Sequence, residues 1–180
     1  LMIDTEKPLC VRAGVIRQLQ TLDGETHARD STTRHAFVVG NPLTPPQYRD
    51  LSGAMEEATL VADMLEKANY RAEFTRTRLG ASEVFKQLFA RSYRIIHIAG
   101  HGQYSEADSG QVGAKAGVVL SDGLFLTAAE IATMDPIPEL VFLNCCHLGQ
   151  MGGTASNKMA ASIASELIRK GVRAVVAAGW

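Results

Sequence analysis

From Ala36 onward, short apolar runs alternate with stretches whose apolar residues recur at helical spacing. This alternation restricts the possible folds more than any other feature. The runs of strand length lie at 36–39, 94–99, 118–120, 140–143 and 172–178, with a further alternating segment at 70–75. The stretches with helical spacing lie at 52–68, 82–89, 127–135 and 159–170. Strands that alternate with helices are typical of βαβ units. We therefore predict an α/β fold with a mainly parallel sheet and helices on both faces.

The composition is that of an ordinary globular domain. The 180 residues suffice for one domain with a sizeable core, and 46% of them are hydrophobic. Lys+Arg 18 against Asp+Glu 19 give a net charge of −1, which argues against bulk binding to nucleic acids or anionic membranes. The basic residues between Arg71 and Arg94 are expected to be solvated surface. Three cysteines, two of them adjacent, do not form a disulfide framework and suit a reducing compartment.

No part of the sequence suggests a membrane or secreted protein. No apolar run approaches the roughly 18 residues of a membrane span. Residues 1–20 carry charges throughout and lack the apolar core of a signal peptide. We therefore expect a cytoplasmic protein.

The two ends of the chain predict a piece of a longer protein. Residues 1–35 have weak helical spacing and then a polar, turn-prone stretch, so we expect a lead-in or a connection from an upstream domain. Residues 36–180 are expected to form the α/β domain. The chain begins with Leu1 and stops at Trp180, directly after an apolar run. This pattern predicts that the domain is cut after its last strand.

Two of the predicted strands end in residues that suggest chemistry. A Gly-His-Gly turn centred on His101 follows the run at 94–99, and Asn-Cys-Cys at 144–146 follows the run at 140–143. If these strands are neighbours, His101 and one cysteine meet at the edge of the sheet where open α/β folds place their ligands. An imidazole can take the proton of a thiol or stabilise the thiolate as an ion pair. Such a dyad performs acyl transfer, and backbone N–H groups of Gly102 and of the nucleophilic cysteine are the expected oxyanion donors.

Spacing alone leaves other arrangements of these residues open. His147 is a poor base for Cys146, because neighbours on an extended chain point to opposite faces. His97 lies about 13 Å from His101 along its strand at ~3.3 Å per residue, so we expect a packed, hydrogen-bonded histidine. A zinc site is disfavoured because adjacent cysteines lack the usual Cys-x₂₋₄-Cys spacing. Both cysteines also suit a buried, structural role.

We expect neither a metal nor a cofactor. No G-x-G-x-x-G or G-x-x-x-x-G-K-[ST] motif is present, so nucleotide binding is disfavoured.

Two runs then match a known pattern. His97–Gly102 reads H-I-A-G-H-G, and Leu140–Cys146 reads L-V-F-L-N-C-C. They resemble the H-x-A-x-H-G and L-V-V-L-S-A-C motifs of CHAT domains, which are caspase-like cysteine peptidases related to separases, caspases and metacaspases. Supporting matches in the right order lie at 37–42, 51–58 (L-P-G-A-x-x-E-A in the family), 117–120 with 126–131, and 171–176. The resemblance covers roughly residues 36–180 and implies a three-layer caspase-like fold.

The resemblance also implies roles for individual residues. It places the family's catalytic histidine at His101 and its nucleophile at Cys146, with oxyanion donors at the backbones of Gly102 and Cys146. Cys145 falls on a small, alanine-like position and is expected to be buried filler. Asn144 falls where relatives often carry a polar or acidic residue that shapes the specificity pocket. In metacaspase-like relatives an acid there favours a basic residue before the cut, so the asparagine leaves that preference open.

These expectations describe a cysteine endopeptidase that cleaves a protein substrate through an acyl-enzyme. CHAT domains often sit beside repeat or sensor modules. We therefore expect a regulatory or sensor domain or subunit as a partner, and part of the substrate groove in the C-terminal part of the domain beyond Trp180. The loops at 103–117 and 152–158 are candidate activation segments. The alternative is a non-catalytic interaction module that keeps the fold, although a decayed site would usually have lost one member of the dyad.

Overall fold

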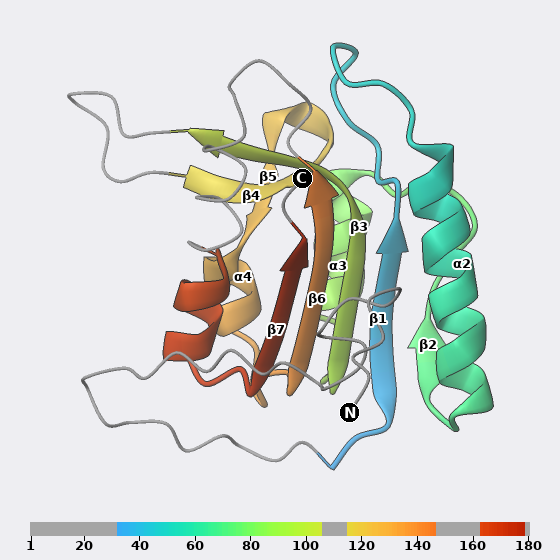
Figure 1. Ribbon diagram of the computed structural model, residues 1–180, viewed down its shortest axis with the longest axis vertical. Coiled ribbons are helices and arrows are strands. Elements are labelled where there is room, and N and C mark those ends of the chain that lie inside the picture. Colours follow the sequence, from blue (N-terminus) through green and yellow to red (C-terminus); the bar gives the residue numbers. More distant parts are fainter. Residues whose placement is uncertain (1–31, 106–114, 147–162, 179–180) are drawn as a thin grey trace, which may run out of the picture.

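The computed structural model describes residues 32–105, 115–146 and 163–178, which form a seven-stranded sheet with helices packed against it (Figure 1). The strands are β1 (His35–Gly40), β2 (Arg71–Glu73), β3 (Ile95–Ser105), β4 (Lys115–Val119), β5 (Phe125–Thr127), β6 (Leu140–Cys146) and β7 (Ala174–Ala178). The helices are α2 (Ser52–Lys67), α3 (Ala81–Leu88), α4 (Ala128–Ala132), the short 3₁₀ turn η1 (Ser121–Gly123) and a helix over residues 163–169.

The centre of the sheet is parallel, as the alternation of strands and helices predicts. β1 lies between β2 and β3, β6 lies between β3 and β7, and all of these pairs are parallel. β3 extends past the part that pairs with β6, and its last four residues, 102–105, pair antiparallel with β4. β4 in turn pairs antiparallel with β5. The predicted α/β fold with a mainly parallel sheet is therefore confirmed.

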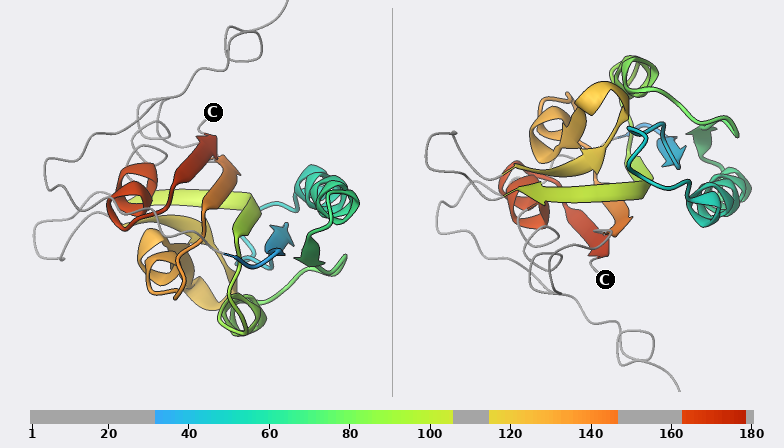
Figure 2. Two further views of the ribbon diagram at one scale, coloured as in Figure 1. Left: turned by 90° about the horizontal axis from the view of Figure 1, so that it is seen from below. Right: turned by 90° about the horizontal axis from the view of Figure 1, so that it is seen from above.

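Different helices cover the two faces of the sheet (Figure 2). On one face, Val38 of β1 packs against Ala58 and Ala62 of α2. We call this side the α2 face. The opposite face holds the main core, to which α3, α4 and the helix at 163–169 all contribute, with Phe37, Ile96, Ile98, Val141, Leu143, Val84, Leu88, Ile131, Ile163 and Leu167 among its members. Because successive residues of a strand alternate between faces, every second residue of β3 and β6 lies on the α2 face.

Side chains from distant parts of the chain satisfy the first N–H groups of two helices. Thr127 caps α4 itself, and Glu130 completes a capping box. Ser52 and Ser82 lie inside α2 and α3 and do not cap them. The first N–H groups of these helices are satisfied from elsewhere: Leu51 N–H donates to Asn41 Oδ1 (3.3 Å), and Ala81 N–H donates to Ser121 Oγ (2.9 Å).

Strands β3 and β6 are longer than the apolar pattern predicts. β3 runs through the expected Gly-His-Gly turn to Ser105, so the expected loop at 103–117 begins as a strand. The antiparallel partner β4 supplies the extension, since Gly102 lies opposite Val118 and Tyr104 opposite Ala116. β5 was not predicted. Polar and glycine residues can extend a strand when a partner strand pairs with their backbone groups. Such an extension has no apolar run, so the sequence pattern does not predict it.

Gly40 allows α2 to lie directly against the end of β1. A Cβ at this position would come within 2.5 Å of Ala58 Cβ and 2.7 Å of Ala54 O. The helix backbone cannot yield as a flexible side chain would, so Gly40→Ala is expected to lower the free energy of unfolding by about 2 kcal/mol. Chemical denaturation would measure the loss. Gly53→Ala is the matched control, because a Cβ there meets nothing within 4 Å and a helical alanine is slightly favoured. Equal stabilities for Gly40→Ala and the wild type would contradict this packing.

Candidate functional site

The backbone positions of His101 and Cys146 lie side by side. The parallel ladder between β3 and β6 runs from Ile95 opposite Leu140 to His101 opposite Cys146. Neighbouring strands of a sheet are about 4.8 Å apart. The register therefore brings together the histidine and the second cysteine, while Gly100 lies opposite Cys145. For Cys146 the structure describes the backbone alone.

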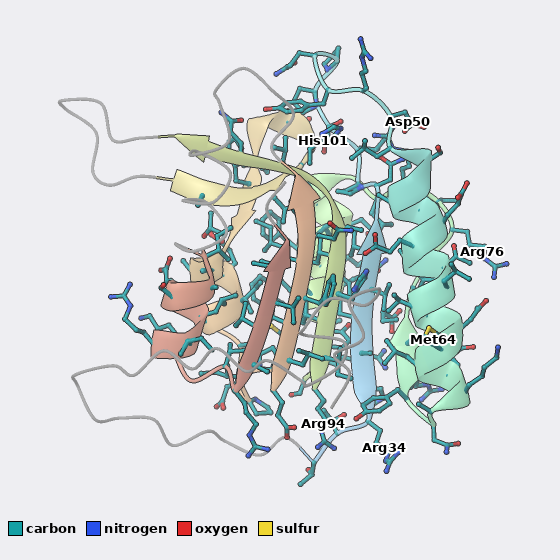
Figure 3. The ribbon with its side chains drawn as sticks, in the orientation of Figure 1. Arg34, Asp50, Met64, Arg76, Arg94 and His101 are labelled. Atoms are coloured by element: carbon teal, nitrogen blue, oxygen red, sulfur yellow. The ribbon has the colours of Figure 1, made fainter. Side chains whose placement is uncertain are left out.

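The ring of His101 is buried and held by the loop that joins β1 to α2. Its exposed fraction is 1%, and its Nε2 lies 2.6 Å from the carbonyl oxygen of Arg49. The ring of Tyr48 packs beside it, with centroids 5.2 Å apart, and Tyr48 Oη donates a hydrogen bond to Gln103 Oε1 (2.7 Å). Figure 3 shows His101 near Asp50, at the end of the sheet where β6 finishes.

The contact with Arg49 fixes the form of the imidazole. A carbonyl oxygen only accepts hydrogen bonds, so Nε2 carries the proton and donates it. In the neutral ring, Nδ1 is then an acceptor with a free lone pair. Within the described part of the chain, this buried Nδ1 has no hydrogen-bond partner. The arrangement can therefore accept a proton at Nδ1 while the carbonyl of Arg49 stabilises the charge that results.

Arg78 holds the loop that carries Arg49. Its guanidinium donates from Nε to the carbonyl of Asn41 (3.0 Å) and from Nη2 to the carbonyl of Pro42 (3.1 Å). Its Nη1 forms an ion pair with Asp50 at 2.8 Å, and Asn41 Nδ2 donates to the same carboxylate oxygen (2.8 Å). Both ends of the loop are thus tied to one side chain.

Arg78 and Arg94, two of the basic residues expected to be solvated surface, are 32% and 34% exposed and also hold specific partners. Arg94 Nε donates to the buried Glu139 at 2.9 Å. Both arginines lie at the ends of strands or loops, where spacing shows no apolar pattern, so the sequence did not single them out.

A second polar group lies on the α2 face, below His101. Glu57 of α2 places Oε1 3.1 Å from His97 Nε2, an approach too bent for a good hydrogen bond, and Oε2 accepts from Asn144 Nδ2 at 2.6 Å. His97 is 4% exposed and stacks on Phe142 with ring centroids 5.0 Å apart. The sequence predicts His97 as a packed, hydrogen-bonded histidine. Its burial confirms the packing, but its Nε2 has no hydrogen-bond partner among the described residues. Glu57 was not among the predicted site residues, although the helix-start resemblance at 51–58 contains it.

Cys145 belongs to the main core on the opposite face. Its exposed fraction is 2%, and its Sγ lies 3.9 Å from the carbonyl oxygen of Ile98. The expected burial of this residue is confirmed. Gly102, an expected oxyanion donor, lies in β3 opposite Val118, and its role stays a prediction.

The described ranges show neither a metal cluster nor a membrane helix. Over residues 32–105, 115–146 and 163–178, no three His, Cys, Asp or Glu side chains are grouped so that they could hold a metal ion. No helix among them is long and apolar enough to cross a bilayer. Most of the candidate activation segments at 103–117 and 152–158 lies outside the described residues.

The burial of His97 predicts a pH dependence of stability. Burial lowers the pKa of His97, and the nearby Glu57 carboxylate opposes this only in part. Because the folded pKa lies below the unfolded value of ~6.5, the unfolded chain binds more protons between the two. The stability contribution is complete above ~6.5 and is lost as the pH falls through the folded pKa. We expect unfolding free energies measured from about pH 8 to about pH 5 to fall less steeply in His97→Gln than in the wild type. Parallel curves for the two proteins would contradict a neutral, buried His97.

Comparison with known proteins gives one match. The sequence model of a family described as the CHAT domain matches residues 4–180, a range that includes every described residue. No match was found among curated proteins or among solved structures.

Proposed function

Because the chain belongs to the CHAT-domain family, which is related to caspase-like cysteine peptidases, we propose that it is a cysteine endopeptidase. The observation that carries the proposal is the pairing of His101 with Cys146 across adjacent strands, with Nε2 of His101 bound to the carbonyl of Arg49. A base next to a thiol, and a third group that orients the base, are the parts that nucleophilic acyl transfer requires.

In the proposed reaction, Nδ1 of His101 takes the thiol proton of Cys146, and the thiolate attacks the carbonyl carbon of the substrate peptide. The N–H groups of Gly102 and Cys146 bind the oxyanion that forms. As the tetrahedral intermediate collapses, the C–N bond breaks and Nδ1 gives its proton to the leaving amine. A thioester on Cys146 remains. Water, deprotonated by Nδ1, then attacks this thioester and releases the carboxylic acid and the free thiol.

The carbonyl of Arg49 supports both proton transfers. It accepts the Nε2–H bond throughout, and this charge-assisted bond strengthens when the ring becomes an imidazolium. The ring is buried, so the bond acts in a region of low effective dielectric, where it is worth more than in water. The base is therefore oriented before substrate binds, and no reorientation is needed during the reaction.

We also propose that the activity depends on a regulatory or sensor module, because CHAT domains often sit beside such modules. The competing possibility, an interaction module without catalysis, keeps the fold but does not need a buried histidine whose Nδ1 lacks a hydrogen-bond partner among the described residues.

Cleavage of a peptide library by the full-length protein tests the proposal. The protein would be incubated with and without its neighbouring subunits, and mass spectrometry would identify new C-termini. We expect cleavage by the wild type and none by Cys146→Ala. A wild type that binds its partners normally but cleaves nothing under either condition would favour the interaction module.

A further inference from the structure

Tyr48, in the loop that joins β1 to α2 (residues 41–51), contacts two side chains of β3. Because side chains alternate along a strand, His101 and Gln103 lie on the same face of β3, about 6.6 Å apart. The ring of Tyr48 packs beside the imidazole of His101, with centroids 5.2 Å apart and planes tilted by 50°. Its hydroxyl donates to Gln103 Oε1 at 2.7 Å. One side chain of the loop thus bridges the proposed base and the residue two positions further along β3.

A tight turn places Tyr48 beside the imidazole. Tyr48 N–H donates to the carbonyl of Pro45 at 3.0 Å, which closes a four-residue turn over 45–48. Pro46 is the second residue of this turn, a position that the fixed φ of proline suits. The carbonyl of the next residue, Arg49, accepts the hydrogen bond from His101 Nε2. The turn therefore brings two consecutive residues, Tyr48 and Arg49, to the same ring.

The bond to Arg49 leaves one motion of the imidazole open. It fixes Nε2, but the torsion about the Cβ–Cγ bond of a histidine has broad minima, so the ring can still tilt about the line from Cβ to Nε2. Nδ1 lies off this line and moves with the tilt, and Nδ1 is the atom that takes the proton of Cys146 in the proposed reaction. The ring of Tyr48 packs against the imidazole, which is only 1% exposed, and so limits the tilt.

We propose that Tyr48 is a positioning residue for His101 and that, through Gln103, it makes the orientation of the base depend on the pairing of β3 with β4. This inference rests on the proposed peptidase function. Gln103 lies in the antiparallel part of β3, opposite Gly117 of β4. Figure 1 shows β3 turning away from the parallel strands in this part. A change in the pairing with β4 moves Gln103, and the hydrogen bond passes that movement to Tyr48 and so to the imidazole.

Steady-state kinetics of peptide cleavage by the full-length protein tests the positioning role. Tyr48→Phe keeps the ring and loses the hydrogen bond, so kcat should fall about 5-fold with KM unchanged. Tyr48→Leu loses the aromatic ring as well, and its kcat should fall about 30-fold. Tyr70→Phe is the matched control and should keep the wild-type kcat. The ring of Tyr70 lies under the guanidinium of Arg34, at the end of the molecule opposite to His101 (Figure 3).

Two further variants test the link through Gln103. Gln103→Met removes the acceptor and should match Tyr48→Phe, and the double variant should be no worse than either, since both changes remove the same bond. A Cβ at Gly117 would lie 2.8 Å from the carbonyl oxygen of Leu126, so Gly117→Ala displaces β4 opposite Gln103. We expect Gly117→Ala to lower kcat about 5-fold in the wild type and at most about 2-fold in Tyr48→Phe. Equal losses in both backgrounds would overturn the link.

Alkylation of Cys146 by iodoacetamide separates positioning of the base from binding of the peptide. This small reagent needs no peptide subsites, and its rate follows the thiolate that the proposed base supplies. Peptide mapping by mass spectrometry would give the rate at Cys146. We expect the rate to fall about 10-fold in Tyr48→Leu and to stay unchanged in Tyr70→Phe. A wild-type rate at Cys146 in Tyr48→Leu would overturn the positioning role.

The outcomes distinguish the inference from the function on which it rests. Cleavage that depends on Cys146, with Tyr48→Leu at the wild-type kcat, would overturn the inference and leave the peptidase standing. So would a loss that appears only in KM or only as a lower temperature of thermal unfolding. Absence of Cys146-dependent cleavage by the wild type with every peptide would overturn both.

Discussion

Cys146→Ala and His101→Ala should each lower kcat/KM for peptide cleavage by at least about 10⁴-fold, which makes them the most damaging substitutions in this chain. The first removes the proposed nucleophile and the second removes its proposed base, so the double variant should be little worse than either single one. Turnover of a cleavable peptide and labelling by an acyloxymethyl-ketone peptide probe measure the two effects independently.

Cys145→Ala is the matched control for the nucleophile. Its thiol packs in the core on the opposite face of the sheet, so labelling should persist while the free energy of unfolding falls by about 1 kcal/mol. Labelling that survives Cys146→Ala and disappears in Cys145→Ala would show that the wrong cysteine has been assigned.

Arg78→Ala should lower kcat by about 100-fold with little change in KM, although Arg78 does not touch the reaction centre. Its guanidinium ties Asn41, Pro42 and Asp50, and so fixes the path of the loop that presents the Arg49 carbonyl to His101. A displacement of about 1 Å in such a group can cost 10²-fold in rate. Steady-state kinetics on the purified protein would separate kcat from KM.

Two further variants serve as controls for Arg78→Ala: Arg78→Lys, which keeps the charge, and Arg76→Ala, which removes a nearby arginine. Arg78→Lys should rescue only part of the loss, because an ammonium group cannot span two carbonyls and a carboxylate in the fixed geometry of a guanidinium. Arg76→Ala removes a more exposed arginine with a looser ion pair to Asp63 (3.8 Å) and should keep the wild-type kcat. A loss in Arg78→Ala that appears only as lower thermal stability, with an unchanged kcat, would refute the positioning role.

The architecture could be predicted from the sequence because it depends on local periodicity. Apolar runs and helical spacing predict the parallel strands and the main helices, since burial on both faces of a sheet requires continuous apolar runs. The ends of β3 and β6 could not be predicted in this way. The last residues of β3 are glycine, histidine, glutamine, tyrosine and serine, and those of β6 are asparagine and cysteine. They are extended because neighbouring strands accept their backbone groups.

The candidate site divides in a similar way. His101 and Cys146 could be predicted, because their side chains have recognisable chemistry and both fall on motifs of the family that the sequence resembles. The strand register then places the two residues opposite each other. The group that orients His101 is the main-chain carbonyl of Arg49. Every residue has such a carbonyl, so the identity of the residue at position 49 could not indicate this contact. Glu57 reaches β3 and β6 only through the packing of α2. Arg78 reaches the loop at 41–51 from a segment more than 25 residues further along the chain, so no local pattern indicates either contact.

Because a main-chain oxygen orients His101, the loop at 41–51 should tolerate some kinds of mutation much better than others. Nearly any residue can replace Arg49, because every residue offers the same carbonyl. The number of residues in the loop and the anchoring contacts of Arg78 set where that carbonyl lies. Insertions and deletions between Asn41 and Leu51 should therefore be far less tolerated than substitutions within it, the reverse of the usual behaviour of surface loops.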